Sequence, residues 1–399
     1  MEFEFVDYQS SARIMVIGIG GAGGNAINNM IHSGLEGVGF LAANTDLQDL
    51  SASNASIKLQ LGMELTRGRG CGADPEVGRQ AALEDVDRIK EVLAEAEMVF
   101  ITAGMGGGTG TGGAPVVAEC LKELENPPLT VAVVTKPFHF EGKRRLMHAE
   151  AGIELLKEYA DTIITIPNDR LLAMAPRGFP IRDAFKLADD VLLQAVKGVS
   201  DLILLPGLIN VDFRDAQKIM SNKGLALMGT GIASGPDRAV QAAQQAISSP
   251  LLEDISIKGA TGILINIASS DNNVTLEEVD EACTLIRNEA GSDDDMIIFG
   301  VAWDETLEDN MRITVIATGI GQEPKQRLEE EKKTLRLANL DEVARRPDVW
   351  ERSPRNRKEA RPQDRLQGFE APQYNNKYES FIFEGEDLEK PTFMRRKAD

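Results

Sequence analysis

The 399-residue sequence has little of the chemistry that indicates a metal site, an extracellular fold or nucleic-acid binding. Its three cysteines are an odd number without C-x-x-C spacing, and its three histidines are scattered, so we expect neither a disulfide framework nor a protein-bound metal such as zinc. Basic residues are outnumbered, because 43 Lys and Arg against 63 Asp and Glu give a net charge of −20. Nucleic acid is therefore not an expected partner, since its phosphates require clustered positive charge. A reducing cytoplasm fits these absences.

Long hydrophobic runs and export signals are missing as well. No stretch reaches the roughly 18 uninterrupted apolar residues of a membrane span. Residues 1–7 lack a basic region followed by an apolar run, so we expect neither export nor direct membrane insertion. The P-loop class is excluded too, because no G-x-x-x-x-G-K-[ST] motif occurs.

The composition changes near Gln322. Residues 323–399 hold 18 basic and 17 acidic side chains, whereas residues 1–322 hold 25 and 46. Residues 323–385 have few aliphatic side chains, which cannot offset the entropy of ordering, and they are predicted to form a disordered linker. Residues 386–399 then combine apolar Leu388, Phe393 and Met394 with three basic residues, which predicts a separate partner-binding peptide.

The length before this change suggests two globular domains. Short apolar runs alternate with helical patterns, which predicts a parallel α/β sheet with strands over residues 13–17, 38–43, 98–103, 129–135 and 162–166. Helical spacing over residues 181–205 predicts a long connecting helix. Strand patterns at 261–268, 296–301 and 312–317, with a helix over 275–287, predict a second α+β domain. The predicted boundaries are 1–180, with a flexible N-terminus over 1–12, then 181–205 and 206–322.

A first glycine-rich loop, residues 18–25, follows a predicted strand and opens a helix. Its backbone N–H groups and the helix dipole would face an anion, so phosphate binding is predicted. Gly18, Gly20 and Gly23 also match the G-x-G-x-x-G dinucleotide fingerprint, and Asp46 lies where a ribose-binding carboxylate would occur. A nicotinamide-dependent, NAD(P)-linked oxidoreductase therefore remains an alternative.

A second loop, residues 104–113, has seven glycines in ten positions and again joins a strand to a helix. Tight turns need only one or two glycines. Two such loops predict an extended polyphosphate ligand. The oxidoreductase hypothesis leaves this second loop unexplained.

The second loop resembles the tubulin signature G-G-G-T-G-[ST]-G, and residues 13–321 are similar to the tubulin/FtsZ family of GTPases, in particular to bacterial FtsZ. Further motifs occur in the family's order at residues 44–46, 74–79, 135–138, 140–145, 166–169 and 210–213. The resemblance covers about four-fifths of the chain. It implies a Rossmann-like GTPase domain with a parallel sheet, a connecting helix, a second activating domain and a terminal partner-binding peptide.

The resemblance also implies which residues contact GTP or GDP. The phosphate cradle would comprise Gly21, Ala22, Gly23, Gly24, Asn25, Gly106, Gly107, Gly108, Thr109 and Gly110. Asn44, Asp46 and Ala73 are further nucleotide-binding candidates, Glu141 and Arg145 would contact the ribose region, and Phe185 would pack on the base. Mg²⁺ would be bound mainly through the nucleotide phosphates. Asp74 stands where Asn is usual, and its charge would need an offsetting cation such as Mg²⁺ or Arg79.

The identity of the base can be argued from the residues themselves. Phe185 and Asp189 are four residues apart on the predicted long helix, so their side chains share one face. A ring beside a carboxylate can stack on guanine and accept hydrogen bonds from its N1–H and N2–H₂ groups. Adenine lacks this donor pair, and the unpaired carboxylate would disfavour it by about 1–3 kcal/mol. GTP is therefore predicted over ATP.

Three acidic or amide side chains, Asn210, Asp212 and Asp215, lie where a loop enters a helix. The residue chemistry alone does not decide between a helix cap and a catalytic role. Asp212 is a good N-cap, and the charge of Asp215 in the first turn suits the helix dipole. The resemblance implies a catalytic loop that enters the pocket of the next subunit and polarises the attacking water. A regulatory protein that binds nucleotide without turnover is a further alternative, against which the two acids argue.

The resemblance implies a function for the whole chain. It predicts a GTPase that polymerises head-to-tail with copies of itself into filaments of the division (Z) ring at the mid-cell septum. Residues 388–399 would bind a membrane-tethering adaptor and division regulators. The active site would be complete only between adjacent subunits.

Overall fold

The computed structural model describes residues 12–172, 176, 178–204, 207–221, 224–252, 257–270, 274–291, 296–320, 382–383 and 386–387. The chain forms two units, residues 1–328 and 329–399. In the second unit, strands β12 (Ile382–Phe383) and β13 (Glu386–Asp387) pair antiparallel. The rest of the predicted linker, the peptide 388–399 and residues 1–11 lie outside the described residues.

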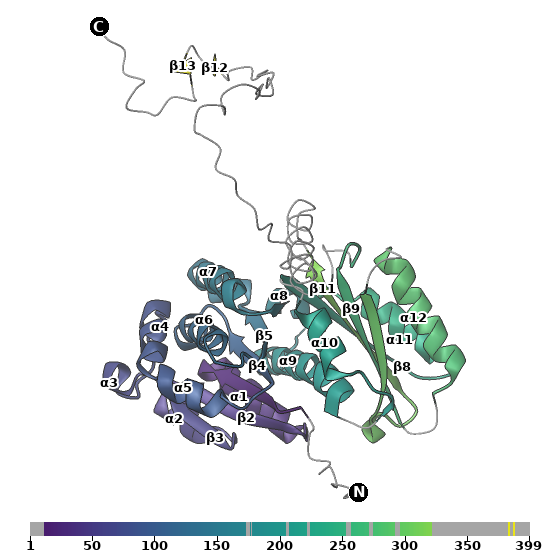
Figure 1. Cartoon of the computed structure of the whole chain (residues 1–399), viewed down its shortest axis with the longest axis horizontal. Coiled ribbons are helices and arrows are strands. Elements are labelled where there is room, and N and C mark those ends of the chain that lie inside the picture. Colours follow the sequence, from purple (N-terminus) through teal and green to yellow (C-terminus); the bar gives the residue numbers. More distant parts are fainter. Residues whose placement is uncertain are drawn as a thin grey trace, which may run out of the picture. The chain divides into compact units, whose positions relative to one another are not determined.

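The first half of the larger unit is a parallel sheet (Figure 1). Its strands are β1 (Ile14–Ile19), β2 (Val38–Asn44), β3 (Ile57–Gln60), β4 (Met98–Gly104), β5 (Leu129–Lys136) and β6 (Thr162–Pro167). They lie in the order β3-β2-β1-β4-β5-β6. The five predicted strands are confirmed, and β3, a four-residue edge strand, is an addition.

Helices cover both faces of this sheet, as a parallel sheet requires. They are α1 (Gly20–His32), α2 (Leu47–Ala52), α3 (Met63–Thr66), α4 (Pro75–Glu84), α5 (Val86–Leu93), α6 (Thr109–Lys122), α7 (Lys143–Tyr159) and α8 (Asn168–Leu172), with a 3₁₀ turn η1 (His139–Glu141). Successive β1 residues alternate between two cores: Val16 packs with α1, and Ile17 packs with α5, α6 and α7. All three cysteines are buried and free.

The predicted long helix is confirmed as α9 (Ile181–Leu204). Its buried residues Val191, Leu192 and Val199 belong to the same core as α1 residues Ile27 and Met30. This core extends into the second half of the unit, so α9 connects the two halves through packing as well as through the chain.

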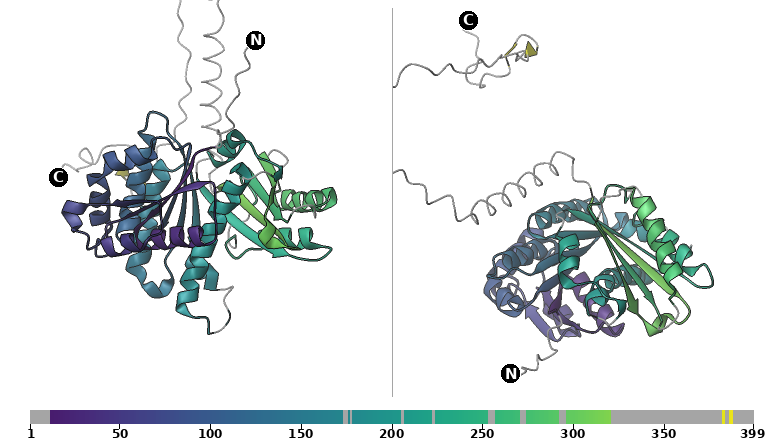
Figure 2. Two further views of the ribbon diagram at one scale, coloured as in Figure 1. Left: turned by 90° about the horizontal axis from the view of Figure 1, so that it is seen from below. Right: turned by 45° about the vertical axis from the view of Figure 1, so that its right-hand side comes forward.

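The second half is an α+β arrangement, as predicted. Its elements are β7 (Gly207–Ile209), α10 (Phe213–Met220), β8 (Leu225–Ala233), α11 (Arg238–Ile247), β9 (Gly262–Ser269), α12 (Leu276–Ala290), β10 (Met296–Trp303), η2 (Glu305–Leu307) and β11 (Met311–Ile320). Strand β11 is antiparallel to β8 and β9, and β10 is parallel to β9. Helices α11 and α12 pack on one face of these strands, seen from two further sides in Figure 2.

The two halves share one sheet. Strand β6 pairs parallel with β8 through Ile163–Leu225 and Ile164–Ala226, which joins the strands into an 11-stranded sheet. The sequence patterns treat the halves as separate sheets, because a junction of two residue pairs leaves no periodic signal. In the described parts of the chain, no helix is both long and apolar enough to cross a bilayer.

Candidate functional site

The two glycine-rich loops lie side by side. Strands β1 and β4 are neighbours in the sheet, so their carboxyl ends meet at the same edge. Helix α1 begins directly after β1 at Gly20, which has a φ of +74°. A Cβ added to Gly20 would lie 3.0 Å from the backbone nitrogen of Gly110, and one added to Gly110 would lie 2.7 Å from the carbonyl oxygen of Gly104. Only glycine allows the loops to approach this closely.

The N-termini of both helices are left without a side-chain partner. No side chain caps α1 or α6, and neither helix has an acidic residue in its first turn. The free N–H groups and the positive ends of two helix dipoles are therefore directed to one region, which suits an anion. A Cβ added to Gly107 would meet nothing within 4 Å, so the loop opens onto free space here.

A cavity of about 480 Å³ occupies this region. The predicted nucleotide-binding residues that line it are Gly21, Ala22, Ala73, Gly107, Gly108, Thr109, Gly110, Glu141, Arg145, Phe185 and Asp189. These residues come from α1, the loop before α4, the second glycine loop, η1, α7 and α9. Segments spread over about 170 residues of sequence are thus brought to one cavity.

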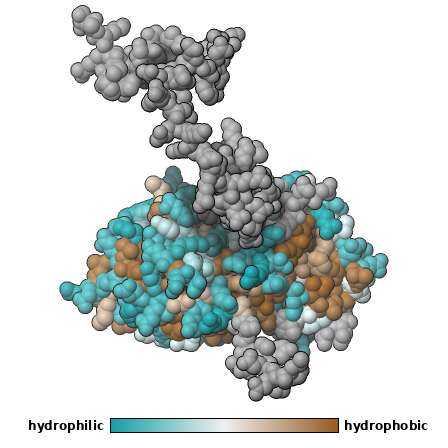
Figure 3. Space-filling view, in the orientation of Figure 1, coloured by the Kyte–Doolittle hydropathy of each residue, from teal (hydrophilic) through white to brown (hydrophobic). Residues whose placement is uncertain are grey.

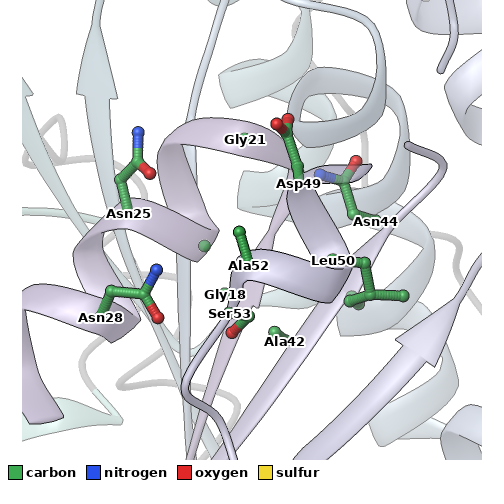
Figure 4. A pocket seen from close by; sticks show the side chains of 13 residues that line it. Gly18, Gly21, Asn25, Asn28, Ala42, Asn44, Asp49, Leu50, Ala52 and Ser53 are labelled. Atoms are coloured by element: carbon green, nitrogen blue, oxygen red, sulfur yellow. The ribbon is translucent and has the colours of Figure 1, made fainter. Parts of the chain in front are cut away.

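Gly24, Asn25 and Asn44 line a smaller neighbouring cavity of about 90 Å³ instead. Figure 4 shows Asn25 and Asn28 of α1 on one side of it and Asn44 with Asp49 of α2 on the other. The two cavities share Gly20, Gly21 and Asp49 in their walls. These residues therefore lie beside the main cavity.

Gly23, Asp46 and Gly106 line neither cavity and have structural roles. A Cβ added to Gly23 would lie 2.6 Å from the carbonyl oxygen of Thr102, so this glycine lets α1 approach β4. The Asp46 carboxylate caps α2 by accepting a hydrogen bond from the Gln48 N–H at 2.9 Å. Gly106 has a φ of +101°, and its N–H donates to the Thr111 hydroxyl, which shapes the second loop.

Phe185 and Asp189 bring a ring and a carboxyl group from α9 to the cavity wall. The Phe185 ring is 43% exposed and meets the buried Phe138 ring edge-on, with centroids 5.3 Å apart. One side of the Phe185 ring therefore remains available for stacking. Burial, and then the neighbouring Asp190, raise the pKa of Asp189 to about 7. A carboxyl group that lies in a cavity with a pKa this far from its ordinary value is a candidate binding residue.

Asn168 is a cavity residue to which the sequence assigned no role. It is 5% exposed and lines the cavity, and its side-chain oxygen Oδ1 has no hydrogen-bond partner in the structure as described. An unpartnered buried acceptor costs about 1–3 kcal/mol, and because Asn168 lines the cavity, this oxygen is a candidate acceptor for a ligand donor. The motif at residues 166–169 was the available signal, but burial and lack of a partner become visible only in the fold.

Arg145 brings a positive charge to the cavity wall. Its Nη1 donates to Glu141 Oε2 at 2.7 Å, and Glu141 Oε1 accepts from the Phe138 N–H at 2.9 Å. Glu141 therefore anchors the guanidinium and ties it to the turn η1. Both residues of the pair for which ribose contact is predicted thus lie in the cavity wall.

Asp49 and Asp74, two acids near the glycine loops, have different surroundings. Asp49, which sequence reasoning did not single out, lines both cavities, and a Cβ added to Gly21 would lie 3.1 Å from its Oδ2. Asp74 instead caps α4 by accepting from the Glu76 N–H at 3.0 Å, a role that Asn fills equally well. Arg79 pairs with Glu76 rather than with Asp74.

The backbone beside Asp74 is strained. Ala73 has a φ of +62°, a left-handed conformation that costs a non-glycine residue roughly 1–2 kcal/mol. Ala73 also lines the cavity. Strain held at a cavity wall supports a binding role for this backbone.

Asn210, Asp212 and Asp215 lie apart from the cavity and are exposed to solvent. The capping prediction is confirmed for Asp212, whose Oδ1 accepts from the Arg214 N–H at 3.2 Å at the start of α10. Asn210 Oδ1 accepts from the Gly207 N–H at 2.8 Å. The buried Val211 donates its N–H to the Leu202 carbonyl, which fixes the loop to the end of α9. The loop thus presents its polar side chains outward on a fixed backbone.

Exposed apolar residues accompany this loop. Leu208 is 61% exposed, and Ile209 and Phe299 on the paired strands β7 and β10 are partly exposed as well. On the face shown in Figure 3, hydrophobic residues gather on the right-hand side, over the second half of the unit. A different exposed apolar group, Met63 and Leu65, lies on α3 in the first half. Exposed apolar side chains beside the loop would be covered if another chain packed against this surface.

Comparison with known families identifies both halves. Residues 13–176 match the model for the Tubulin/FtsZ family, GTPase domain, and residues 224–321 match the model for the FtsZ family, C-terminal domain. These ranges contain every described residue of the cavity except those on α9, together with most of the second half. The matches do not support the oxidoreductase alternative.

Individual proteins similar to this chain belong to the same family as the matching models. The chain is 53% identical over 313 residues to the cell division protein FtsZ of Coxiella burnetii, covering 78% of this chain and 80% of the relative. It is 50% identical to that of Buchnera aphidicola, with coverage of 80% and 82%. A solved empty FtsZ dimer from M. jannaschii superposes with a TM-score of 0.75 at 45% identity, covering 79% and 90%. The GTPγS-bound protofilament of CetZ2 from Haloferax volcanii, 21% identical with a TM-score of 0.65 and coverage of 82% and 99%, shares the fold.

Proposed function

The chain belongs to the FtsZ branch of the tubulin/FtsZ family of GTPases, and from this membership we propose how its cavity binds and hydrolyses GTP. It is a GTP-binding, GTP-hydrolysing, tubulin-like protein of cell division. One observation carries the proposal for the site. Two uncapped helix N-termini open onto a cavity whose wall also holds an exposed ring, a carboxyl group and an unpartnered amide oxygen.

The nucleotide phosphates bind at the starts of α1 and α6. Backbone N–H groups of residues 20–22 and 107–110 donate to the phosphate oxygens, and the two dipoles favour the negative charge. The open space over Gly107 supports this placement. Arg145, anchored by Glu141, contacts the sugar side.

The guanine base binds at the α9 end. Phe185 packs on its face, and Asp189 accepts from N1–H and N2–H₂ once it is ionised. The unpartnered oxygen of Asn168 supplies a further acceptor for an N–H group of the base, while the preference for guanine over adenine rests on Asp189, because adenine has no N1–H to donate to it. GTP and GDP are therefore the preferred ligands.

Mg²⁺ arrives with the nucleotide and is bound mainly through its phosphates. Mg²⁺ sites commonly combine one or two carboxylates with substrate phosphates and water. Asp49 is the carboxylate placed beside the phosphate end of the cavity, so it is the side chain that fits this ion. The ion would neutralise phosphate charge and offset the repulsion from Asp49.

Hydrolysis requires two subunits. Asp212 and Asp215 do not line the cavity of their own chain, yet they are exposed on an anchored loop next to apolar surface. This placement supports a role on the nucleotide of a neighbour, where they would orient and activate the attacking water with Asn210 beside them. Head-to-tail assembly joins two different surfaces and repeats without closing, which produces a filament.

The tail links such a filament to the division site. Residues 388–399, which lie outside the described residues, combine apolar anchors with basic charge and suit a groove on a membrane-tethering adaptor or a regulator. We place the protein in the cytoplasm, assembling at the mid-cell division site through this peptide.

Light scattering combined with phosphate release tests the proposed function. Adding GTP and Mg²⁺ to the protein should raise scattering and release phosphate, whereas ATP should do neither. Equal responses to both nucleotides, or displacement of labelled GTP by NAD in preference to GDP, would contradict the assignment.

A further inference from the structure

The two ends of the nucleotide cavity are carried by two different helices. Helix α1 supplies the phosphate end through Gly21 and Ala22, and α9 supplies the base end through Phe185 and Asp189. The helices pack together in one core, with Ala26, Ile27 and Met30 on α1 and Ala188, Val191 and Leu192 on α9. The hydrophobic effect that drives this packing is not directional, so a directional contact between the helices adds to the precision with which the interlocked side chains place one helix along the other.

A side-chain hydrogen bond also joins these two helices. The Asn29 amide Nδ2 donates to Asp190 Oδ1 at 2.9 Å, and the bond is half-buried. Asp190 is one residue from Asp189, and Asn29 lies on α1 two turns after Gly21. A hydrogen bond to a charged acceptor is among the stronger and more geometrically demanding contacts available here.

We propose that the Asn29–Asp190 hydrogen bond is a positioning contact for guanine-nucleotide binding, which holds the base-binding face of α9 at the distance from the phosphate-binding end of α1 that one nucleotide spans. The inference rests on the proposed function of the cavity. Asp190 and Asn29 act through their neighbours and need not touch the nucleotide.

The contact has an electrostatic consequence for Asp189. By fixing the Asp190 carboxylate beside it, the bond maintains a like charge that, after burial, raises the pKa of Asp189. The other charged or titratable groups in the walls around Asp189 are Arg182 and Lys186 on α9, His32 on α1, and Asp49, Glu141 and Arg145 across the main cavity. Asp190 therefore influences the pH at which Asp189 becomes an acceptor for guanine.

Binding of whole and partial ligands distinguishes positioning from simple contact. A nucleotide bound at both ends benefits from the fixed separation, whereas guanosine or tripolyphosphate uses one end only. Asn29→Ala should weaken GDP binding on the order of tenfold while changing the affinities for guanosine and tripolyphosphate less than about twofold. Displacement of a fluorescent GTP analogue measures all three affinities.

A swapped pair tests the contact independently of any loss of stability. Asn29→Asp alone places two carboxylates together and should weaken GDP binding at least as much as Asn29→Ala. Adding Asp190→Asn to it recreates the bond with donor and acceptor reversed, and GDP affinity should recover to within about threefold of the wild type. Asp183→Asn, an exposed change on the same helix, is the matched control and should have no effect.

The effect of the Asp190 charge on Asp189 is measured by the pH dependence of GDP affinity. Asp190→Asn still offers an amide oxygen to Asn29, so GDP affinity at pH 8 should stay near the wild-type value while the midpoint of its pH dependence falls. Equal loss of GDP and guanosine binding in Asn29→Ala, or no recovery in the swapped pair, would overturn the proposal. Failure of the wild type to prefer GDP over ADP would instead overturn the proposed function itself, so the two failures are distinguishable.

Discussion

Gly20 and Gly110 bring the starts of two helices into contact, because a Cβ on Gly20 would lie only 3.0 Å from the Gly110 nitrogen. Gly107, three residues before Gly110 in the same loop, is not in close contact with the protein, since a Cβ added to it would meet no protein atom within 4 Å. The proposed phosphate region therefore contains glycines required by the fold and a glycine that leaves room for a ligand.

Two alanine substitutions separate these roles. Gly110→Ala places a methyl group 2.7 Å from the Gly104 oxygen and should destabilise the fold by roughly 1–3 kcal/mol. Gly107→Ala should fold normally but lose at least tenfold in GDP affinity, because its methyl group occupies the phosphate site. Thermal unfolding with and without GDP measures both effects. Normal GDP stabilisation of the Gly107→Ala variant would contradict the placement of the phosphates.

Asn168→Ala should weaken GTP binding by about tenfold without destabilising the empty protein. Its buried Oδ1 has no partner in the structure as described, so its removal costs no internal hydrogen bond and relieves an unsatisfied group. Urea unfolding of the free protein and competition binding provide the two numbers. A large loss of stability with unchanged affinity would show that Asn168 is a structural residue.

GTP affinity should increase as the pH is raised from 6 to 8 and then level off. The pKa of Asp189 is about 7, and only the ionised carboxylate accepts from both guanine donors. The sign for the empty protein is opposite: because this folded-state pKa lies above the ordinary value, Asp189 makes stability fall as the pH rises from about 4 to 7. Titration calorimetry across this pH range tests the binding, and Asp189→Asn should flatten the profile.

Asp49→Asn should tighten nucleotide binding in the absence of Mg²⁺ by roughly fivefold, because it removes about 1 kcal/mol of screened repulsion from the phosphate end. When Mg²⁺ is added, the nucleotide affinity of Asp49→Asn should increase less than that of the wild type. Asp87→Asn, an exposed change on α5, is a suitable control. If the Mg²⁺ dependence of nucleotide affinity were the same in Asp49→Asn and the wild type, Asp49 would not contribute to Mg²⁺ binding.

The sequence predicts the strands whose apolar runs are uninterrupted, and it misses those built differently. Strand β8 contains Gly229 and Gly231, and a Cβ on either would lie about 2 Å from a carbonyl oxygen of α11. The glycines allow close packing of the helix, but they remove the β-branched pattern by which a strand is predicted. The joining of β6 to β8 is equally invisible, because it depends on two residue pairs far apart in sequence.

The candidate site divides in the same way. The glycine loops and the Phe185–Asp189 spacing are local patterns, so sequence reasoning finds them. The roles of Asn168 and Asp49 depend on burial, on an absent partner and on proximity to α1, and each of these is a property of the folded chain. The placement of Gly23, Asp46 and Gly106 outside the cavity also becomes evident only from packing.

Asp212→Asn and Asp215→Asn should keep GTP binding but reduce turnover by roughly 100-fold, as expected when a group that positions or activates water is removed. Asn caps helices about as well as Asp, so Asp212→Asn should also leave α10 intact. Equilibrium binding of GTP beside phosphate release measures the two properties separately. A parallel loss of binding would place these residues in their own chain's pocket.

We propose that the acids of one subunit act on the nucleotide of the next subunit. The most direct measurement is phosphate release per chain as a function of protein concentration, for the wild type and for an equimolar mixture of Asp215→Asn and Gly107→Ala. The account predicts a concentration threshold for the wild type and partial activity in the mixture, because Asp215→Asn retains an intact pocket and Gly107→Ala retains an intact loop. Activity per chain that stays constant down to the most dilute samples, with a mixture no more active than its components, would contradict it.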